Sequence, residues 1–421
     1  MIFNSNKEKF IFYNFPVLLF FFIPFFLITG PFLSDLSISL ISIFFLIYCC
    51  KKRNFSYFNN KYFYFFLIFC FYLIFNSLIN NFNLDSLKIS IFYFRYGVFV
   101  IAVVALLNTN DNFIKYFFYS ILICFIILIF DGFYQYFFGK NVLGWKLGGR
   151  VTSFFGDEKI LGSYLTRLWP IFFAIFVILF KKKNYLFYIV IVIFILSEVL
   201  IFISGERAAF FYINFSAIFV ILLSEKLLKL RLLILSFSIL MIVIISLINP
   251  SAKNRIIDHT LNQMNLVKDE KKNYEGIYIF SMQHTHHYLS AYRMFLDNKI
   301  LGVGVKNFRN FCHYDKYKES RFSCSSHPHN TYIQILTETG IIGFIFLLTV
   351  LFLFLKFVIY HALLKIRGKH YFNDFEICIL SGIAIYLWPF IPTGNIFNNW
   401  LNIAMILNLP FLIWSRKLIN T

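Results

Sequence analysis

Residues 185–203 read YLFYIVIVIFILSEVLIFI, an apolar run in which Glu198 is the one charged residue. A helix rises about 1.5 Å per residue, so about 20 apolar residues cross the hydrocarbon core of a bilayer. Runs of this kind recur along the 421 residues of the chain, of which 59% are hydrophobic and 14% charged. A soluble domain is nearer half apolar and one quarter charged. The sequence therefore predicts an all-α polytopic membrane protein.

Around this run, further apolar segments predict about twelve transmembrane helices. Residues 1–249 carry the first nine helices and an outer loop at 139–158. Residues 250–332 form a large outer loop or cap between helices nine and ten, and residues 333–421 carry the last three helices. The three parts form one integral membrane domain. The predicted spans are 10–29, 34–50, 61–80, 88–107, 113–138, 159–180, 185–203, 206–224, 232–249, 333–360, 375–392 and 397–415.

Positive charge in the short loops indicates the orientation of these helices, because cytoplasmic loops carry an excess of Lys and Arg. Loops on the opposite side, at 30–34, 80–86 and 393–395, carry almost none. The pattern predicts that both termini lie in the cytoplasm. The basic segments on the cytoplasmic side are Lys51 to Arg53, Lys181 to Lys183, 226–231, 365–369, and Arg416 with Lys417.

The formal net charge of +19 is explained by basic cytoplasmic loops that face anionic lipid. The sequence contains no basic-aromatic pattern typical of RNA binding, no P-loop glycine run and no Rossmann fingerprint. We therefore expect a lipid bilayer as partner, and neither nucleic acid nor nucleotide chemistry.

The large outer loop contains two cysteines, Cys312 and Cys324, shortly before a histidine motif. An outer loop of this topology lies in an oxidising compartment, where disulfides persist. A disulfide between them would close a short loop and order the approach to the histidines. Two free thiols are the alternative.

Four charged residues fall within predicted helices, in the outer half of the membrane. Charges at that depth are costly and usually face one another or a polar cavity. One interpretation forms two structural ion pairs, Arg95 with Asp131 and Arg167 with Glu198. The other is a polar chamber that opens outward, in which Arg95 and Arg167 contact a substrate.

Two motifs place an arginine at the outer surface. Arg150 follows a glycine pair that permits tight turns close to a ligand, and a guanidinium binds phosphate through two parallel hydrogen bonds. Arg207 lies in Ser204-Gly205-Glu206-Arg207, at the start of a helix where a cation has the unfavourable sign. Either Glu206 or a bound phosphate compensates it. The alternative for Arg150 is an ordinary surface arginine, and the alternative for Arg207 is an arginine paired locally with Glu206.

The third motif is Ser325-Ser326-His327-Pro328-His329-Asn330, immediately before the span at 333–360. Asn330 or Thr331 can cap this helix, which leaves His329 at its positive end. That field and partial burial keep an imidazole neutral, so that it can accept a proton from a sugar hydroxyl. A structural cap is the alternative. A metal site is a further one, although its spacing matches no standard zinc pattern; its ligands would be His284, His286, His287, His327 and His329.

In combination, these residues resemble the bacterial O-antigen ligase family and its polymerase relatives over about residues 130–415. The topology, with a large outer loop between helices nine and ten, is also similar. The matching segments are Arg150, Phe155-Gly156-Asp157, 161–165, Ser204 to Arg207, Phe295, 301–305, Asn307-Phe308-Arg309, and His329-Asn330 followed by Gly340.

The resemblance implies an inverting, metal-independent glycosyltransferase of the bacterial inner membrane, with no cofactor. Such an enzyme moves a glycan from undecaprenyl diphosphate to a sugar hydroxyl of lipid A-core at the periplasmic face. It implies that His329 is the base, and that Arg150 and Arg207 bind the diphosphate. His327 and Asn330 would contact substrate beside it.

Two other functions remain open. An O-antigen polymerase would use the same chemistry to join undecaprenyl-linked repeat units. A transporter of lipid-linked glycans would not catalyse transfer, and intramembrane charges are compatible with it. Transport favours interrupted helices in corresponding halves of the chain, and no internal repeat of this kind is evident in the sequence.

Overall fold

The computed structural model describes residues 6–80, 82–109, 112–180, 184–263, 280–318 and 320–418. Within these ranges the named elements are all helical, and extended pairing is confined to one bridge between Lys140 and Lys146. The predicted basic loop at Lys181 to Lys183 lies outside the described residues. The all-α character expected from the apolar runs is confirmed for the described chain.

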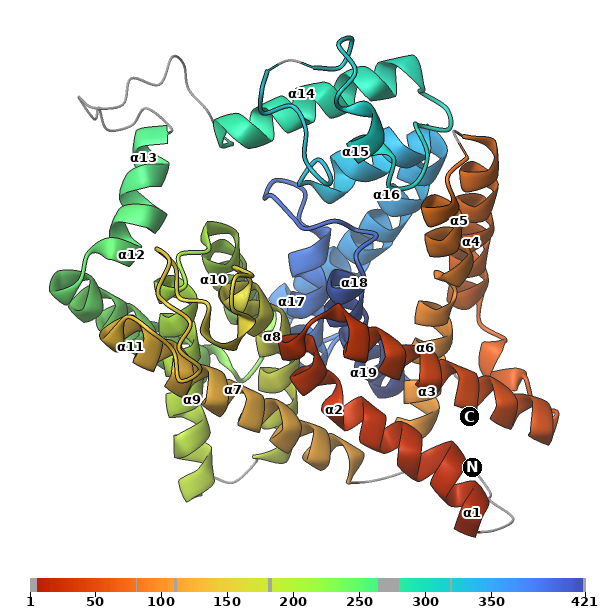
Figure 1. Ribbon diagram of the computed structural model, residues 1–421. Helices are drawn as coiled ribbons and strands as arrows, with labels where there is room; N and C mark the ends of the chain where they lie inside the picture. Colours follow the sequence, from red (N-terminus) through yellow and green to blue (C-terminus); the bar gives the residue numbers. More distant parts are fainter. Residues whose placement is uncertain are drawn as a thin grey trace.

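The first part of the chain is a bundle of helices joined by short loops, in which α2 packs on α3 and α4 on α5 (Figure 1). Its elements are α1 (Asn6–Lys9), η1 (Phe10–Asn14), α2 (Phe15–Thr29), α3 (Pro31–Lys52), η2 (Ser56–Phe58), α4 (Lys61–Ile79), α5 (Leu84–Phe92), α6 (Arg95–Leu107), α7 (Phe113–Phe138), η3 (Ser153–Phe155), α8 (Leu161–Leu179), α9 (Tyr185–Ile203), α10 (Arg207–Leu223) and α11 (Leu228–Ile248).

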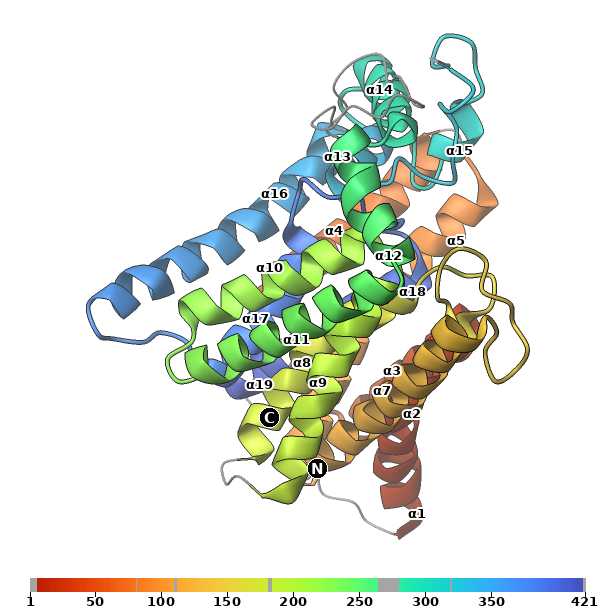
Figure 2. The same cartoon turned by 90° about the vertical axis from the view of Figure 1, so that its left-hand side faces the viewer.

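The second part adds a cap above the bundle and then returns into it. In Figures 1 and 2, α14 and α15 lie at the end of the molecule opposite to α1 and α19. The elements are α12 (Ser251–Lys253), η4 (Asn254–Asp258), α13 (His259–Gln263), α14 (Met282–Asp297), α15 (Phe308–Phe311), α16 (Thr331–Ile366), α17 (Asp374–Leu387), α18 (Asn399–Ile406) and α19 (Asn408–Ser415).

Nine helices of the described chain are long and apolar enough to cross a membrane. The other three predicted spans are formed by shorter helices: α10 has 17 residues, α17 has 14, and α18 and α19 have 8 each. Pro389 explains one of these differences, because it lacks an N–H and forces Trp388 into extended backbone, which ends α17. The fold is that of a polytopic membrane protein.

The centre of the bundle is α8, against which α7, α9, α10 and α17 pack. Its Trp169 is fully buried and stacks on Phe173 with the ring centroids 4.8 Å apart. Phe125 and Phe172 lie 4.9 Å apart at the contact of α7 with α8. Stacked and tilted aromatic rings pack closely against each other. Close packing of this kind holds helices together inside a bilayer, where no hydrophobic driving force acts between them.

Both ion pairs predicted inside the membrane are wrong. Arg95 binds Asp35 at 2.6 Å, and Glu198 binds Arg231 at 2.6 Å. Depth along a helix, which the sequence indicates, does not determine which neighbouring helix the side chain faces. These pairs do confirm the rule that charges buried in a membrane protein meet a partner.

Asp131 instead holds the outer loop 139–158 against the end of α7. Its carboxylate accepts hydrogen bonds from the backbone N–H of Val142 at 2.9 Å and from the Ser153 hydroxyl at 2.6 Å. One turn further along the helix, the Gln135 side-chain oxygen accepts two backbone N–H groups, those of Thr152 and Ser153, both at 2.8 Å. This loop is therefore fixed by two buried polar side chains.

Helix α16 breaks at Gly340, where the backbone has φ 63° and ψ −166°. The glycine-rich segment before the histidine motif fits into the break: Val303 N–H donates to the Thr337 carbonyl, and Gly304 N–H donates to the Glu338 carbonyl, each at 2.9 Å. Only glycine adopts this backbone freely. The two segments quoted for the resemblance therefore contact each other.

Three of the basic segments predicted to be cytoplasmic meet at one end of the bundle. Lys365 Nζ donates to the carbonyls of Leu222 and Ser224 at 2.7 and 2.6 Å, and Arg416 donates to the Tyr371 carbonyl at 2.8 Å. This clustering supports the loop pairing that the charge pattern indicates. The assignment of this end to the cytoplasm stays a prediction.

Candidate functional site

The histidine motif lies where the cap meets the start of α16. Asn330 caps this helix: its side-chain oxygen accepts the N–H groups of Tyr332 at 2.9 Å and Ile333 at 3.1 Å. Its amide donates to the Pro389 carbonyl at 2.7 Å. Asn330 thus joins α16 to the segment after α17, and this fixes the position of the preceding histidine.

His327 and His329 lie side by side, with ring centroids 4.0 Å apart. The His327 Nε2 lies 3.3 Å from the Thr393 carbonyl, which can only accept, so Nε2 carries the proton. Its Nδ1 then accepts from the Ser326 hydroxyl at 2.9 Å. In the neutral ring both nitrogens of His327 are therefore engaged in structural hydrogen bonds.

His329 differs from its neighbour in this respect. Its Nε2 lies 2.9 Å from the Ser325 hydroxyl, and its Nδ1 has no hydrogen bond to any described residue. The backbone has φ 61°, a conformation that a residue other than glycine rarely adopts, and the Thr393 N–H holds the His329 carbonyl at 2.8 Å. One imidazole nitrogen of His329 thus has no hydrogen-bond partner among the described residues, and the backbone of His329 is held by Thr393, in the segment that follows α17.

Two further histidines complete the cluster from α14. The His329 ring lies 5.1 Å from the His284 ring and 5.3 Å from the His287 ring. His287 is hydrogen-bonded to the backbone of Cys324, and Tyr288 donates to the His329 carbonyl at 3.5 Å. Helix α14 therefore places His284 and His287 in contact with the histidine motif.

The pKa values of these imidazoles are low. Burial lowers the pKa of His329 to about 4, with a further contribution from His287. Burial and the neighbouring His329 lower the pKa of His327 to about 3 and that of His284 to about 4. The cluster is therefore neutral at pH 7, and it can accept protons or hydrogen bonds without carrying charge.

Beside the imidazoles, three arginines surround the turn at Gly205. Arg255 Nε donates to the Gly205 carbonyl at 3.0 Å, and Arg207 donates to the Thr260 hydroxyl at 3.3 Å. A Cβ at Gly205 would lie 2.7 Å from Arg255 Cδ, so only glycine admits this approach. Burial, then the charges of Arg255 and Arg207, lower the pKa of Arg150. We call Arg150, Arg207 and Arg255 the arginine group.

Glu206 partly compensates this charge, since it opposes the lowering of the Arg150 pKa, but its hydrogen bonds go elsewhere. Its carboxylate accepts the N–H groups of Gly162 at 2.6 Å and Ser163 at 3.1 Å, and the Ser163 hydroxyl at 2.7 Å. It thus caps the N-terminus of α8, where a negative charge is favourable. Concentrated positive charge with its nearest carboxylate already bound is the arrangement expected for a phosphate site.

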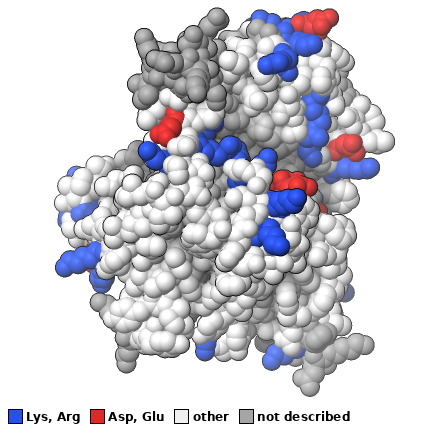
Figure 3. Space-filling model, turned by 60° about the vertical axis from the view of Figure 1, so that its left-hand side comes forward, with Lys and Arg blue, Asp and Glu red and all other residues white. Residues whose placement is uncertain are grey.

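The arginine group and the imidazoles are contiguous. The charge of Arg207 contributes to the lowered pKa of His284, whose ring contacts His329. Figure 3 shows Lys and Arg side chains gathered in a hollow on this face of the molecule. Arg150, Arg207, His327, His329 and Asn330 thus lie in one region of the molecule, and their role as a joint site stays a prediction.

The two intramembrane arginines take different positions. Arg167 lies close enough to Glu206 to influence its carboxylate, and it donates to the Ser163 carbonyl at 3.2 Å, directly below the arginine group. Arg95 lies elsewhere, in a separate cavity with Asp35. Of the two, Arg167 is therefore the one that adjoins the site.

Sequence reasoning missed Arg255 as a site residue and considered His284 and His287 only as metal ligands. Arg255 lies in the short π-helical segment η4, where no motif or periodicity marks it. The two histidines lie on the cap helix, far along the chain from the arginines. Their proximity to the motif follows from tertiary packing of α14 on α16, which a single sequence does not report.

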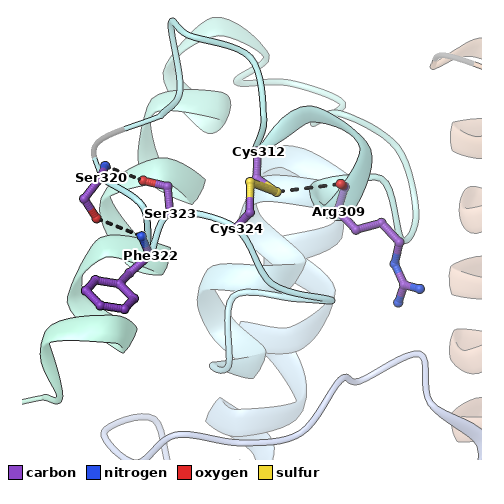
Figure 4. The surroundings of a disulfide bond; sticks show 6 residues. All are labelled: Arg309, Cys312, Ser320, Phe322, Ser323 and Cys324. Atoms are coloured by element: carbon purple, nitrogen blue, oxygen red, sulfur yellow. Dashed lines mark hydrogen bonds between the residues drawn. A yellow bond between two sulfur atoms is a disulfide. The ribbon is translucent and has the colours of Figure 1, made fainter.

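The cysteines of the cap form a disulfide, Cys312–Cys324, shown in Figure 4. Within the described chain, the set of three metal-ligand side chains whose donor atoms converge within 4.8 Å is Cys312, His313 and Cys324. Two of these three are joined by the disulfide. The imidazoles of the cluster contact one another without converging in this way, so their geometry does not fit a shared metal ion.

Comparison with known proteins gives a family for this region. No curated protein matches the chain. Residues 189–348 match the family described as O-antigen ligase. The matched segment includes Arg207, Arg255, His327 and His329, whereas Arg150 precedes it. The match agrees with the family that the motifs indicate: over residues 189–348, the chain is similar to the O-antigen ligase family.

Proposed function

We propose that this protein is a membrane glycosyltransferase that moves a glycan from undecaprenyl diphosphate to a sugar hydroxyl of lipid A-core at the periplasmic face. Its family consists of O-antigen ligase and polymerase-type membrane enzymes. The observation that carries the proposal is that the arginine group lies near a neutral imidazole cluster, close enough for the charge of Arg207 to act on His284, whose ring contacts His329. A base beside an anion site is what this transfer requires.

In this mechanism the donor's diphosphate binds the arginine group, and the acceptor hydroxyl lies at the unoccupied nitrogen of His329. The imidazole takes the hydroxyl proton as the oxygen attacks the anomeric carbon. The bond from that carbon to the phosphate oxygen breaks, and undecaprenyl diphosphate leaves with the bonding electrons. A single displacement of this kind inverts the anomeric configuration.

The arginine group stabilises the charge that develops on the leaving phosphate. Removing one such donor from a preorganised site typically costs about 10²–10³-fold in rate. Three guanidinium groups supply this stabilisation without a divalent cation, and the lipid diphosphate already activates the sugar. We therefore expect transfer to continue in the presence of a chelator.

The low pKa of His329 in the free protein keeps it neutral but makes it a weak base. A bound diphosphate adds negative charge beside the imidazoles and raises their pKa values. Donor binding would thus bring the base closer to the pKa at which general-base catalysis is most efficient. The two groups are coupled through their charges.

A second candidate is O-antigen polymerase, because the family and the chemistry are shared and only the acceptor differs. Glycans of a deletion strain distinguish the two. Uncapped lipid A-core together with long lipid-linked polymer identifies a ligase, and core bearing a single repeat unit identifies a polymerase. Complementation with His329→Ala tests catalysis itself: unchanged glycans would exclude both enzymes and favour a transporter.

A further inference from the structure

A second basic group lies near the histidine motif, where the segment between α14 and α15 packs at the α16 break. It consists of Lys306 and Arg309, with Lys88 of α5 below them. Arg309 and Lys88 are exposed, and Lys306 is half-buried. In Figure 4 the Arg309 guanidinium extends away from the disulfide. None of the three forms an ion pair within the described chain.

The backbone of this segment is held firmly. The Lys306 N–H donates to one Glu338 carboxylate oxygen at 3.0 Å, and the Phe308 N–H donates to the other at 3.2 Å. The Ser86 hydroxyl of α5 donates to the Val305 carbonyl. Lys306 has φ 60°, a conformation that costs a residue other than glycine energy and that persists where the surroundings impose it.

The charge of this segment is incompletely neutralised. Burial and the neighbouring Arg309 lower the pKa of Lys306, while the charges of Glu338 and Asp85 oppose this effect. Glu338 already binds two backbone N–H groups and the Gln334 amide. The three cations Lys306, Arg309 and Lys88 thus face two carboxylates, Glu338 and Asp85, and the first of these is already engaged, so net positive charge remains to bind an anion.

This basic group adjoins a cavity of about 270 Å³ in the outer part of the bundle. The cavity begins at Lys88, on the helix whose Ser86 binds the segment, and continues between α3, α6 and the start of α18. Inside it, the Arg95–Asp35 pair is internally neutralised, and the Tyr96 hydroxyl donates to Asn399. The remaining positive charge therefore lies at the Lys88 side.

Each of the two basic groups lies near a different histidine of the cluster. Arg309 contributes to the lowered pKa of His327, whereas Arg207 contributes to that of His284. Both of these rings contact His329, at 4.0 and 5.1 Å. An anion at each basic group would therefore place two ligands near different imidazoles, both of which contact His329.

We propose that Lys306, Arg309 and Lys88 bind the anionic headgroup of the acceptor lipid, and that the cavity beside them receives the part of that headgroup nearest the membrane. This inference rests on the proposed function for its naming of the acceptor. In this proposal, the donor binds the arginine group and the acceptor binds the second basic group, near His327. It also requires the acceptor to carry phosphate or carboxylate groups close to its lipid anchor.

The test measures binding and transfer separately, with purified protein in liposomes and lipid A-core as the acceptor. The variant is Lys306→Asn with Arg309→Gln, because asparagine tolerates the left-handed backbone at position 306. We expect acceptor binding and acceptor KM to weaken about tenfold, as loss of charge-assisted hydrogen bonds predicts, with donor KM unchanged. Arg321→Gln is the control, since its neighbours Ser320 and Phe322 lie across the disulfide from Arg309 (Figure 4).

Dephosphorylated lipid A-core provides the second arm. Wild-type protein should bind it about tenfold more weakly, and the double variant should show no further loss, because the two changes remove the same contact. Unchanged acceptor binding, or additive losses, would overturn the proposal. So would a variant effect that vanishes in liposomes without anionic phospholipid, since the group would then bind bulk membrane. If the wild-type protein binds the acceptor normally but transfers no glycan, the result would instead contradict the proposed function alone.

Discussion

His329 combines a strained backbone, a free ring nitrogen and a low pKa at one position. The neighbouring His327 has both nitrogens engaged in hydrogen bonds. In the sequence, the register of Asn330 favours His329 as the base, and a structural cap is the alternative interpretation of the motif. The cap role falls to Asn330, which leaves His329 available for chemistry.

The pH dependence of transfer follows from the low pKa of His329. Because the base must be neutral, kcat/KM should be constant from pH 8 to about 5 and fall only as the pH approaches the free-protein pKa of about 4. An unperturbed histidine would give an acid limb near pH 6.5. A pH profile of initial rates with the lipid donor well below its KM checks this, because kcat/KM reports the pKa values of the free protein. An acid limb near 6.5 would contradict the burial that lowers the pKa.

Arg255 is the arginine that the sequence did not single out, and its substitution tests the arginine group. We expect Arg255→Gln to lower kcat about 10²-fold, since one donor to the leaving phosphate is removed. Arg255→Lys should retain part of the rate, because the charge remains while the planar fork is lost. Lys253→Gln, an exposed neighbour, is the control in the same transfer assay. Equal rates for Arg255→Gln and wild type would exclude Arg255 from the site.

At the scale of elements, the break in α16 positions the segment that carries both the motif and the second basic group. A Cβ at Gly302 would lie 2.6 Å from the Thr337 carbonyl oxygen, at a backbone φ of 72°. Gly302→Ala should therefore destabilise the protein by at least about 1–2 kcal/mol, measured by thermal unfolding in detergent. Gly148→Ala is the control, because a Cβ there meets nothing within 4 Å. Equal stabilities would mean that the segment does not pack in the break.

The disulfide is the second element that positions the site. Cys324 binds His287 through its backbone, and His287 contacts His329. Replacing Cys312 and Cys324 together by serine should lower transfer while the cap stays folded, because Ala291, Met294 and Phe308 still pack in its core. The loss of stability should be about 3 kcal/mol or less. Cys50→Ser, at an exposed free cysteine, is the control, and full activity of the double variant would contradict this positioning role.

Across the whole molecule, the sequence predicts the positions of the helices well, but it predicts poorly which helices and side chains contact one another. Apolar runs identify most spans because a helix inside a bilayer must be long and uniformly apolar. The same uniformity hides which face of a helix meets which neighbour, so Arg95 and Glu198 were paired with the wrong partners. The span at 375–392 was too long because Pro389 ends α17 at a distance that hydropathy does not register.

The candidate site shows the same division. Arg150, Arg207 and His329 were identified because glycine turns, an unfavourable helix-start charge and a helix cap each leave a local signature. Arg255 and the α14 histidines leave no such signature in the sequence, because their role depends on how the cap packs over the bundle. The proximity of each basic group to a different histidine of the cluster is a property of the folded molecule alone.

The central claim is that His329 is the base of a glycosyl transfer between lipid-linked donor and acceptor. It is tested most directly by the single-turnover rate of transfer in proteoliposomes, comparing wild type with His329→Ala and with His313→Ala as a surface control. We predict that His329→Ala lowers this rate about 10²–10⁴-fold while donor binding and thermal stability are retained. A His329→Ala protein that transfers glycan at the wild-type rate would contradict the account.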